Sequence, residues 1–195
     1  MILFDIMNRP IKIAIITNIP TPYRKAQWEY YSKCENLDIT IFYCGQIERD
    51  RHWKVTSAEG VDEVYIRGLS YKAFYINPGV FKVILMDFDL FVIGGYTSPS
   101  MMMAIILLKI LKKHWVLMID GISPLKLGND NILVKLIKRF FITGADAYFA
   151  NGLVSFRYLE NYGINPKKIF NQFLSVDIDY FMSKKGNSSK LIKEI

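Results

Sequence analysis

Short apolar, β-branched runs alternate with helical patterns along most of the chain, and this alternation restricts the fold more than any other feature. Several runs, such as IKIAII at 11–16 and WVLMI at 115–119, are continuously hydrophobic. Continuous runs are typical of parallel strands that are covered on both faces. Strands that alternate with helices therefore predict an α/β protein with a doubly wound, mostly parallel sheet and right-handed crossovers.

The expected strands span 11–16, 38–43, 63–66, 89–93, 115–119, 147–150 and 169–173, and the expected helices span 22–33, 78–86, 99–113, 131–143 and 153–162. Two helix starts are well marked, because Thr21-Pro22 and Ser98-Pro99 each place a hydroxyl at the N-cap and proline at the first helical position. Both starts follow a strand. We therefore expect both helices to begin at the carboxyl edge of the sheet, where doubly wound sheets bind ligands.

Composition excludes several classes of protein. The 195 residues suit one domain, and 51% of them are hydrophobic, which allows a large core. Two cysteines and two histidines provide neither a disulfide framework nor a set of zinc ligands. The N-terminus lacks the positive region of a signal peptide, and the uncharged stretch 90–108 is interrupted by Gly94-Gly95 and Pro99. We expect a cytoplasmic protein without a metal or cofactor.

The positive charge is concentrated in the second part of the chain. Residues 1–108 carry 11 basic and 11 acidic residues, whereas residues 109–195 carry 14 and 7. This asymmetry indicates a basic face toward an anionic surface or substrate, or else an ordinary lysine-rich surface in contact with solvent. Nothing in the sequence indicates nucleic-acid binding.

The expected helix 131–143 is strongly amphipathic. Lys135, Lys138 and Arg139 lie opposite a wide apolar face that consists of Ile132, Leu133, Leu136, Ile137, Phe140 and Phe141. A basic amphipathic helix can lie on an anionic membrane, but its apolar face more often packs on the sheet. The sequence favours packing, and it leaves peripheral contact with the inner face of the membrane as the alternative.

The loop after the first strand, TNIPTPYR at 17–24, contains neither a dinucleotide fingerprint nor a phosphate-binding lysine motif. Arg24 falls at the third helical position, where a capping box would favour Glu or Gln and where a cation opposes the helix dipole. A residue that breaks a local rule at the carboxyl edge indicates function. Arg24 is a candidate to hold a phosphate or a sugar hydroxyl, and the alternatives are a salt bridge or an exposed arginine.

Two further segments place candidate residues at strand ends. DLFVIGGYTS at 89–98 carries Gly94 and Gly95, which allow a ligand to approach the backbone, and Tyr96, which can stack on a sugar ring. The glycines can equally serve only to make the turn. Asp120-Gly121 follows the strand at 115–119, where a carboxylate can orient or deprotonate a hydroxyl. Asp-Gly is also a common turn pair, so an Asx turn or a helix cap is the alternative for Asp120.

Taken together, these segments resemble the N-terminal half of a GT-B fold glycosyltransferase of the family 4 kind. The most specific segment is GADAYFANGLVSFRYLENYGINPKKIFNQFLSVDIDYF at 144–181, whose closing Val176-Asp177 and Phe181 are similar to the hinge before the donor-binding domain. The resemblance covers about residues 11–181. It implies a Rossmann-like domain that forms the acceptor side of a cleft between two domains.

The resemblance also implies an activity and a set of site residues. Such enzymes transfer a sugar from a nucleotide-sugar donor to an acceptor without a metal. Asp120 matches the strand-end position near the acceptor, although family 4 enzymes are thought to react with help from the leaving phosphate rather than a base. The cleft loops match Tyr23, Arg24, Gly94 and Gly95, and the residue analysis adds Tyr96 and Gly121 as substrate-binding candidates.

The resemblance divides the chain into an N-terminal extension at 1–10, the acceptor-side domain at 11–181 and a linker at 182–195. The donor domain, with its paired glutamates, is expected beyond this sequence, so we expect no transferase turnover from these residues alone. The expected function is the acceptor side of a glycosyltransferase that acts on a glycan or lipid-linked acceptor in cell-surface polysaccharide synthesis. The alternative is a non-catalytic binding or assembly module that pairs with a separate donor-domain subunit.

Overall fold

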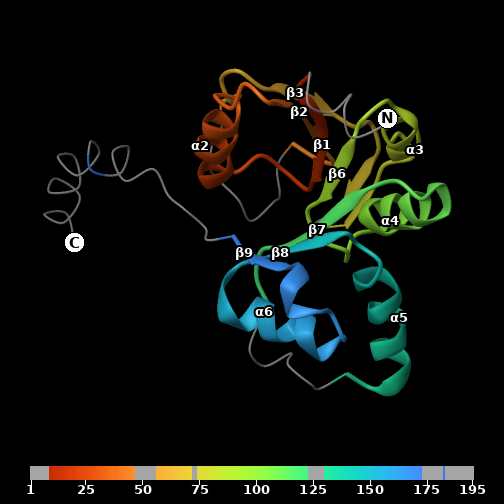
Figure 1. The fold of residues 1–195 in the computed structure, drawn as a ribbon. Helices are drawn as coiled ribbons and strands as arrows, with labels where there is room; N and C mark the ends of the chain where they lie inside the picture. Colours follow the sequence, from red (N-terminus) through yellow and green to blue (C-terminus); the bar gives the residue numbers. More distant parts are fainter. Residues whose placement is uncertain (1–8, 47–55, 72–73, 123–129, 173–181, 183–195) are drawn as a thin grey trace, which may run out of the picture.

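The computed structural model describes residues 9–46, 56–71, 74–122, 130–172 and 182. Seven strands form one sheet in the order β3-β2-β1-β6-β7-β8-β9, and each neighbouring pair is parallel (Figure 1). The strands are β1 (Ile11–Thr17), β2 (Leu37–Tyr43), β3 (Asp62–Tyr65), β6 (Leu90–Ile93), β7 (Trp115–Ile119), β8 (Ala147–Ala150) and β9 (Ile169–Asn171). The predicted doubly wound α/β fold is therefore confirmed.

The helices cover the two faces of the sheet unequally. They are α2 (Pro22–Tyr31), α3 (Val80–Leu85), α4 (Pro99–Leu111), α5 (Ile132–Ile142) and α6 (Gly152–Asn161), with a short 3-10 turn at Pro166–Lys168. Among these, α2 packs on one face through Trp28, while α3, α4 and α6 bury their apolar residues against the other face. Figure 1 shows α2 on the opposite side of the sheet from α3 and α4.

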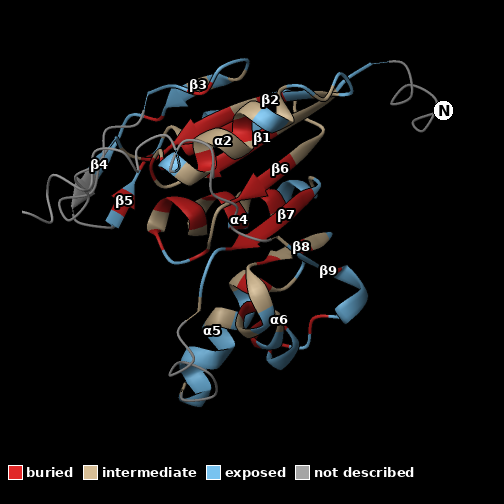
Figure 2. Cartoon of the chain, turned by 90° about the vertical axis from the view of Figure 1, so that its left-hand side faces the viewer, coloured by how far each residue is buried: buried red, intermediate tan, exposed pale blue. Residues whose placement is uncertain are grey.

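The core explains why the continuous apolar runs form parallel strands. Successive residues of one strand face opposite layers: Ile15 joins the cluster under α2, while Ala14 and Ile16 join the larger cluster under α3 and α4. All five residues of β7 are buried, as expected for a central strand that is covered on both sides (Figure 2).

The helix caps agree with the sequence patterns in position but not fully in bonding. Ser98 caps α4, and its side chain accepts a hydrogen bond from the backbone N–H of Met101. Thr21 stands at the N-cap of α2 with Pro22 at the first helical position, but its hydroxyl makes no capping bond. Gly163 follows α6 at φ +83°, the left-handed conformation in which helices commonly end at a glycine.

Three features differ from the expected elements. The hairpin β4 (Leu69–Tyr71) and β5 (Phe74–Ile76) was not expected. The helix expected at 78–86 is shorter, because Pro78 and Gly79 form a turn before α3. The hinge motif at 176–181, residues 47–55 and nearly all of the linker at 182–195 lie outside the described residues.

The largest departure from expectation concerns α5. Of its residues only Ile142 is fully buried, and Phe141 is partly buried against the core. The preferred interpretation, that the apolar face of this helix packs on the sheet, is therefore wrong for most of that face. No described helix has both the length and the apolar character needed to cross a bilayer.

The N-terminal edge of the sheet contains an ion pair that makes stability depend on pH. The Arg9 guanidinium donates two hydrogen bonds of 2.7 Å to the Asp89 carboxylate, which also accepts the Lys12 backbone N–H at 2.9 Å. The bonds from Arg9 lower the pKa of Asp89 to about 2, whereas an unfolded aspartate titrates near pH ~3.9. The stabilisation is thus complete above the unfolded pKa and is lost as the pH falls toward 2.

We expect Asp89→Asn to lower the free energy of unfolding at pH 7 by about 1 kcal/mol. Asparagine is neutral, so it cannot accept both hydrogen bonds from the Arg9 guanidinium as a charged carboxylate does. The difference in the free energy of unfolding between wild type and the variant should shrink between pH 5 and pH 2. Urea unfolding of both proteins at several pH values measures this difference. A difference that stays constant down to pH 2 would contradict the assignment.

Candidate functional site

The parallel strands bring four loops to one edge of the sheet. β1 ends at Thr17, β6 at Ile93, β7 at Ile119 and β8 at Ala150, and the chain continues from each into a loop. The strand order reverses between β1 and β6, since the chain proceeds from β1 toward β3 on one side and from β6 toward β9 on the other. Such a switch point leaves a crevice at the carboxyl ends of the strands, which is the usual ligand site of an open α/β sheet.

The two adjacent glycines after β6 have different roles. The Gly94 N–H donates to the Ile16 carbonyl at 2.8 Å, and a Cβ on Gly94 would lie 3.0 Å from Thr17 Oγ1 and 3.2 Å from the Ile16 oxygen. Gly94 therefore allows β1 and β6 to approach each other. Gly95 has φ +114° and no atom within 4 Å of its Cβ position, so it faces open space. Close approach of a ligand remains possible at Gly95 rather than at Gly94.

Arg24 and Asp120, which the sequence suggested separately, form an ion pair. The Arg24 guanidinium donates through Nη2 to Asp120 Oδ1 and through Nη1 to Gln27 Oε1. Arg24 is only 5% exposed, and its guanidinium carbon lies 5.6 Å from the ring centroid of Trp28. The structure therefore shows the salt-bridge alternative for Arg24, with α2 joined to the end of β7.

Asp120 remains accessible although it is paired. Its side chain is 45% exposed, and its second oxygen accepts no hydrogen bond from the described residues. Within the described backbone no N–H donates to this carboxylate, so neither the Asx-turn nor the helix-cap alternative is present there. The Asp120 carbonyl accepts a bond of 2.6 Å from the Asn151 amide. The loops after β1, β7 and β8 are thereby connected through Asp120.

The two candidate tyrosines lie in different surroundings. Tyr23 is half-buried at the start of α2, with the guanidinium carbon of Arg24 5.9 Å from its ring centroid. Tyr96 is buried, with 7% exposure, and its hydroxyl is hydrogen-bonded to the hydroxyl of Tyr158 on α6. The expectation that Tyr96 stacks on a sugar does not agree with this arrangement, because α6 would have to move to expose the ring.

One residue of this edge, Gly152, was not singled out from the sequence. A Cβ added at Gly152 would meet no atom within 4 Å, as is also the case for the predicted site residues Gly95 and Gly121. We call Gly95, Gly121 and Gly152 the glycine floor. The available sequence signal was Asn151-Gly152, a turn pair directly after a predicted strand.

The loop between β1 and α2 contains polar atoms that lack partners. Asn18 Oδ1 and Thr21 Oγ1 are buried and make no hydrogen bond with the described part of the chain. A buried polar atom without a partner is unfavourable, by about 1–3 kcal/mol. Their position at the switch point fits a loop whose hydrogen bonds are completed by a bound water or ligand.

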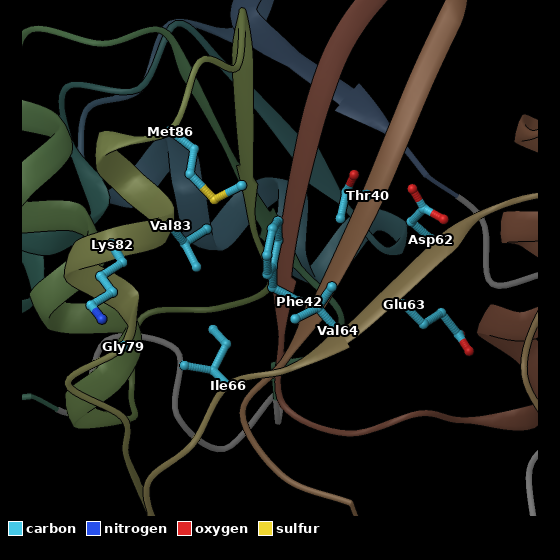
Figure 3. A pocket seen from close by; sticks show the side chains of 10 residues that line it. All are labelled: Thr40, Phe42, Asp62, Glu63, Val64, Ile66, Gly79, Lys82, Val83 and Met86. Carbon is cyan, nitrogen blue, oxygen red and sulfur yellow. The ribbon is translucent and has the colours of Figure 1, made fainter.

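Several hollows in the described part of the chain lie away from this edge, and two of them have mainly apolar linings. One of about 530 Å³ lies between strands β2 and β3 and helix α3, and Figure 3 shows its apolar lining around Phe42, Val83 and Met86. The other, of about 180 Å³, is an apolar groove on the α2 face of the sheet that includes Trp28 and Phe149. Neither contains a residue that the sequence suggested as a site residue. In the described ranges no three His, Cys, Asp or Glu side chains gather where they could bind a metal ion.

The glycines of the edge provide a matched pair of substitutions. We expect Gly94→Ala to lower the free energy of unfolding by about 1–3 kcal/mol, because the new methyl group presses on Thr17 and on the Ile16 carbonyl. Gly121→Ala, with open space around it and no positive φ, should change stability by less than about 0.5 kcal/mol. Urea unfolding of both variants measures the difference, and equal effects would contradict the close approach at Gly94.

No protein-family model and no curated protein matches this sequence. Solved structures do match its fold. The Anabaena protein Alr3699/HepE, crystallised with UDP and glucose, aligns with a TM-score of 0.59 at 13% identity over 87% of this chain and 46% of its own. Its UDP-glucose complex gives a TM-score of 0.58 at 14% identity, over 87% and 45% of the two chains. UDP-GlcNAc 2-epimerase from Methanocaldococcus jannaschii gives 0.47 at 12% identity, over 83% and 45%.

These likenesses concern the fold, because the sequence identities are low. This chain spans about half the length of the HepE chain that it matches. The sheet order and the parallel pairing agree with the fold that the family resemblance implied. The chain thus has the Rossmann-like fold of one half of a GT-B protein.

Proposed function

We propose that this chain forms the acceptor side of a glycosyltransferase cleft, of the family 4 kind. The reaction would move a sugar from a nucleotide-sugar to a glycan or lipid-linked acceptor in the synthesis of a cell-surface polysaccharide. The observation that carries the proposal is the position of Asp120 at the end of β7: Arg24 donates to one carboxylate oxygen, the side chain stays 45% exposed, and Gly121, with open space at its Cβ position, follows directly.

This arrangement suits the recognition of a hydroxyl group. A carboxylate that is fixed by a guanidinium keeps one orientation and accepts hydrogen bonds through its remaining lone pairs. Glycines without side chains leave room for a sugar ring to lie against the backbone. Asp120 would therefore orient the acceptor hydroxyl, and Arg24 would act as a positioning residue for Asp120 rather than as a ligand of phosphate.

The proposed transfer forms a bond between the acceptor hydroxyl oxygen and the anomeric carbon of the donor sugar. The bond from that carbon to the nucleotide diphosphate breaks, and the diphosphate leaves with the electron pair. The hydroxyl proton passes to the leaving phosphate, while Asp120 keeps the hydroxyl oriented. This route requires neither a metal nor a cofactor.

The nucleotide-sugar would be held mainly by a donor-side domain, in the same chain or in a separate subunit. The complexes of Alr3699/HepE with UDP and with UDP-glucose support a nucleotide-sugar as the donor, since that protein shares this fold. If the donor domain belongs to a separate subunit, this chain is a binding module that completes the cleft with it. In both cases we place the reaction at the cytoplasmic face of a membrane, where a lipid-linked acceptor would be available.

The test uses the amide signals of glycine, which are readily distinguished in a nitrogen–proton NMR spectrum. Farnesyl diphosphate linked to N-acetylglucosamine serves as the lipid-linked probe and free UDP-glucose as the donor probe. We expect the lipid-linked probe to shift Gly95, Gly121 and Gly152 while Gly60 and Gly163, which lie outside the glycine floor, stay unchanged. Stronger shifts with UDP-glucose, or transfer of glucose by these 195 residues alone, would overturn the assignment to the acceptor side.

Asp120→Asn tests the role of the carboxylate in this binding. We expect affinity for the lipid-linked probe to fall about tenfold, because a hydrogen bond to a charged group is replaced by a neutral one. The matched control is Asp146→Asn, an exposed aspartate that precedes β8 at the opposite edge of the sheet. Equal affinity of wild type and Asp120→Asn in the same titration would exclude Asp120 from acceptor recognition.

A further inference from the structure

Helix α5 presents its apolar side to the outside of the molecule. The side chains of this side are between 49% and 74% exposed, and Figure 2 shows most of the helix in the colour of exposed residues. We call this side the α5 apolar surface, and it consists of Ile132, Leu133, Leu136, Ile137 and Phe140. A surface helix of a globular domain normally turns such a stripe toward the core, and a contiguous exposed patch of this kind marks an interaction site.

Polar contacts hold the helix in this orientation. Asn131 caps its first turn by accepting the Val134 N–H at 2.9 Å. The Lys138 ammonium donates bonds of 2.7 and 2.6 Å to the two oxygens of Asp130. Near the other end the Lys109 ammonium lies 4.3 Å from the ring centroid of Phe140 and donates to the Phe140 carbonyl. The contacts of Lys109 join α5 to α4, whereas the cap and the Lys138 bonds are made within the α5 segment. The α5 apolar surface is left exposed.

Three of the helices on this side of the sheet carry positive charge only, whereas α6 on the same side contains one arginine and one glutamate. Helices α3, α4 and α5 contain no aspartate or glutamate, and their charged residues are Lys82, Lys109, Lys135, Lys138 and Arg139. Lys112 and Lys113 follow directly after α4. Figure 1 shows the three helices along one side of the molecule, with α4 between α3 and α5.

Helices α4 and α3 also carry exposed apolar side chains. Ile110 and Leu111 on α4, together with Phe81 and Leu85 on α3, are exposed large hydrophobic residues. Apolar side chains beside lysines are the composition of a helix that lies in the interface of an anionic bilayer. The apolar side enters the boundary between headgroups and acyl chains, while long cationic side chains reach the headgroups.

We propose that α5 lies in the surface of an anionic lipid bilayer through the α5 apolar surface, with Lys135 and Arg139 at the level of the headgroups. The charges favour lipid over a second copy of this chain, because two such faces would bring lysines against lysines. This inference rests on the membrane location proposed above and adds the surface that makes the contact. It does not depend on the transfer reaction, since it needs neither donor nor acceptor.

The first test is sedimentation with lipid vesicles. We expect the chain to sediment with vesicles of phosphatidylcholine and phosphatidylglycerol, to bind vesicles of phosphatidylcholine alone at least about tenfold more weakly, and to be released as salt is raised. Equal binding to both kinds of vesicle, or binding to neither, overturns the proposal. The glycine-signal titration is carried out without vesicles, so a failure here is distinguishable from a failure of the proposed function.

Substitutions locate the contact on α5. Leu136→Glu is expected to reduce binding to the anionic vesicles at least about tenfold, because an exposed leucine that would enter the lipid becomes charged. The matched control is Tyr30→Glu, which replaces an exposed hydrophobic residue of α2 on the other face of the sheet. Similarly, Lys135→Gln should weaken binding about fivefold, whereas Lys33→Gln, after the end of α2, should leave it unchanged.

Two outcomes of these variants would overturn the proposal. One is Leu136→Glu binding the anionic vesicles as tightly as Tyr30→Glu does. The other is light scattering that finds a dimer of the wild-type chain and a monomer of Leu136→Glu, since the occupant would then be a second copy. Each variant replaces an exposed residue, and the dispersion of its NMR spectrum verifies that it is folded.

Discussion

The pairing of β1 with β6 is the contact on which the rest of the fold depends. It joins the part of the sheet that continues toward β3 to the part that continues toward β9. At the carboxyl end of this pair the Gly94 N–H bonds to the Ile16 carbonyl, at a spacing where a Cβ on residue 94 would make unusually tight contacts. The strand order reverses at this pair, so the adjacency of these two strands determines where at the carboxyl edge the candidate site lies.

Much of the fold could be predicted from the sequence because buried parallel strands are continuous apolar runs. The strands at β1, β7 and β8 agree with the predicted ranges to within one residue. The hairpin β4–β5 was missed, since its strands have three residues each and give too short a pattern to recognise. The pattern at 131–143 correctly predicted a helix, but periodicity identifies which residues share a side and not what covers that side.

The candidate site could be predicted only residue by residue. Arg24 was noticed because a cation in the first turn is locally unfavourable, and Asp120 because it follows a central strand. Their pairing depends on how α2 crosses the sheet, which no local pattern contains. The sequence around Tyr96 did not indicate that this side chain is buried. The residue to which its hydroxyl is bonded, Tyr158, lies on α6, 62 positions further along the chain.

The buried tyrosines connect the carboxyl edge of the sheet with the side of the molecule that carries α5. Tyr96 after β6 bonds to Tyr158 on α6, whose ring lies 4.9 Å from that of Tyr162. The Tyr162 hydroxyl donates to Asp130, which also binds Lys138 on α5. Burial, together with these hydrogen bonds, raises the pKa of Tyr96 and Tyr162, so both phenols remain neutral and able to donate.

The ion pair between Arg24 and Asp120 has a consequence for the order of folding. Its partners are 96 positions apart, so the chain gains it only after β1, β6 and β7 have assembled side by side. Contacts between distant residues form after local ones, because a long loop must first be closed at the expense of chain entropy. The orientation of Asp120 is thus acquired late. During synthesis on the ribosome, a nascent chain that already displays the first strands and α2 still lacks the oriented carboxylate.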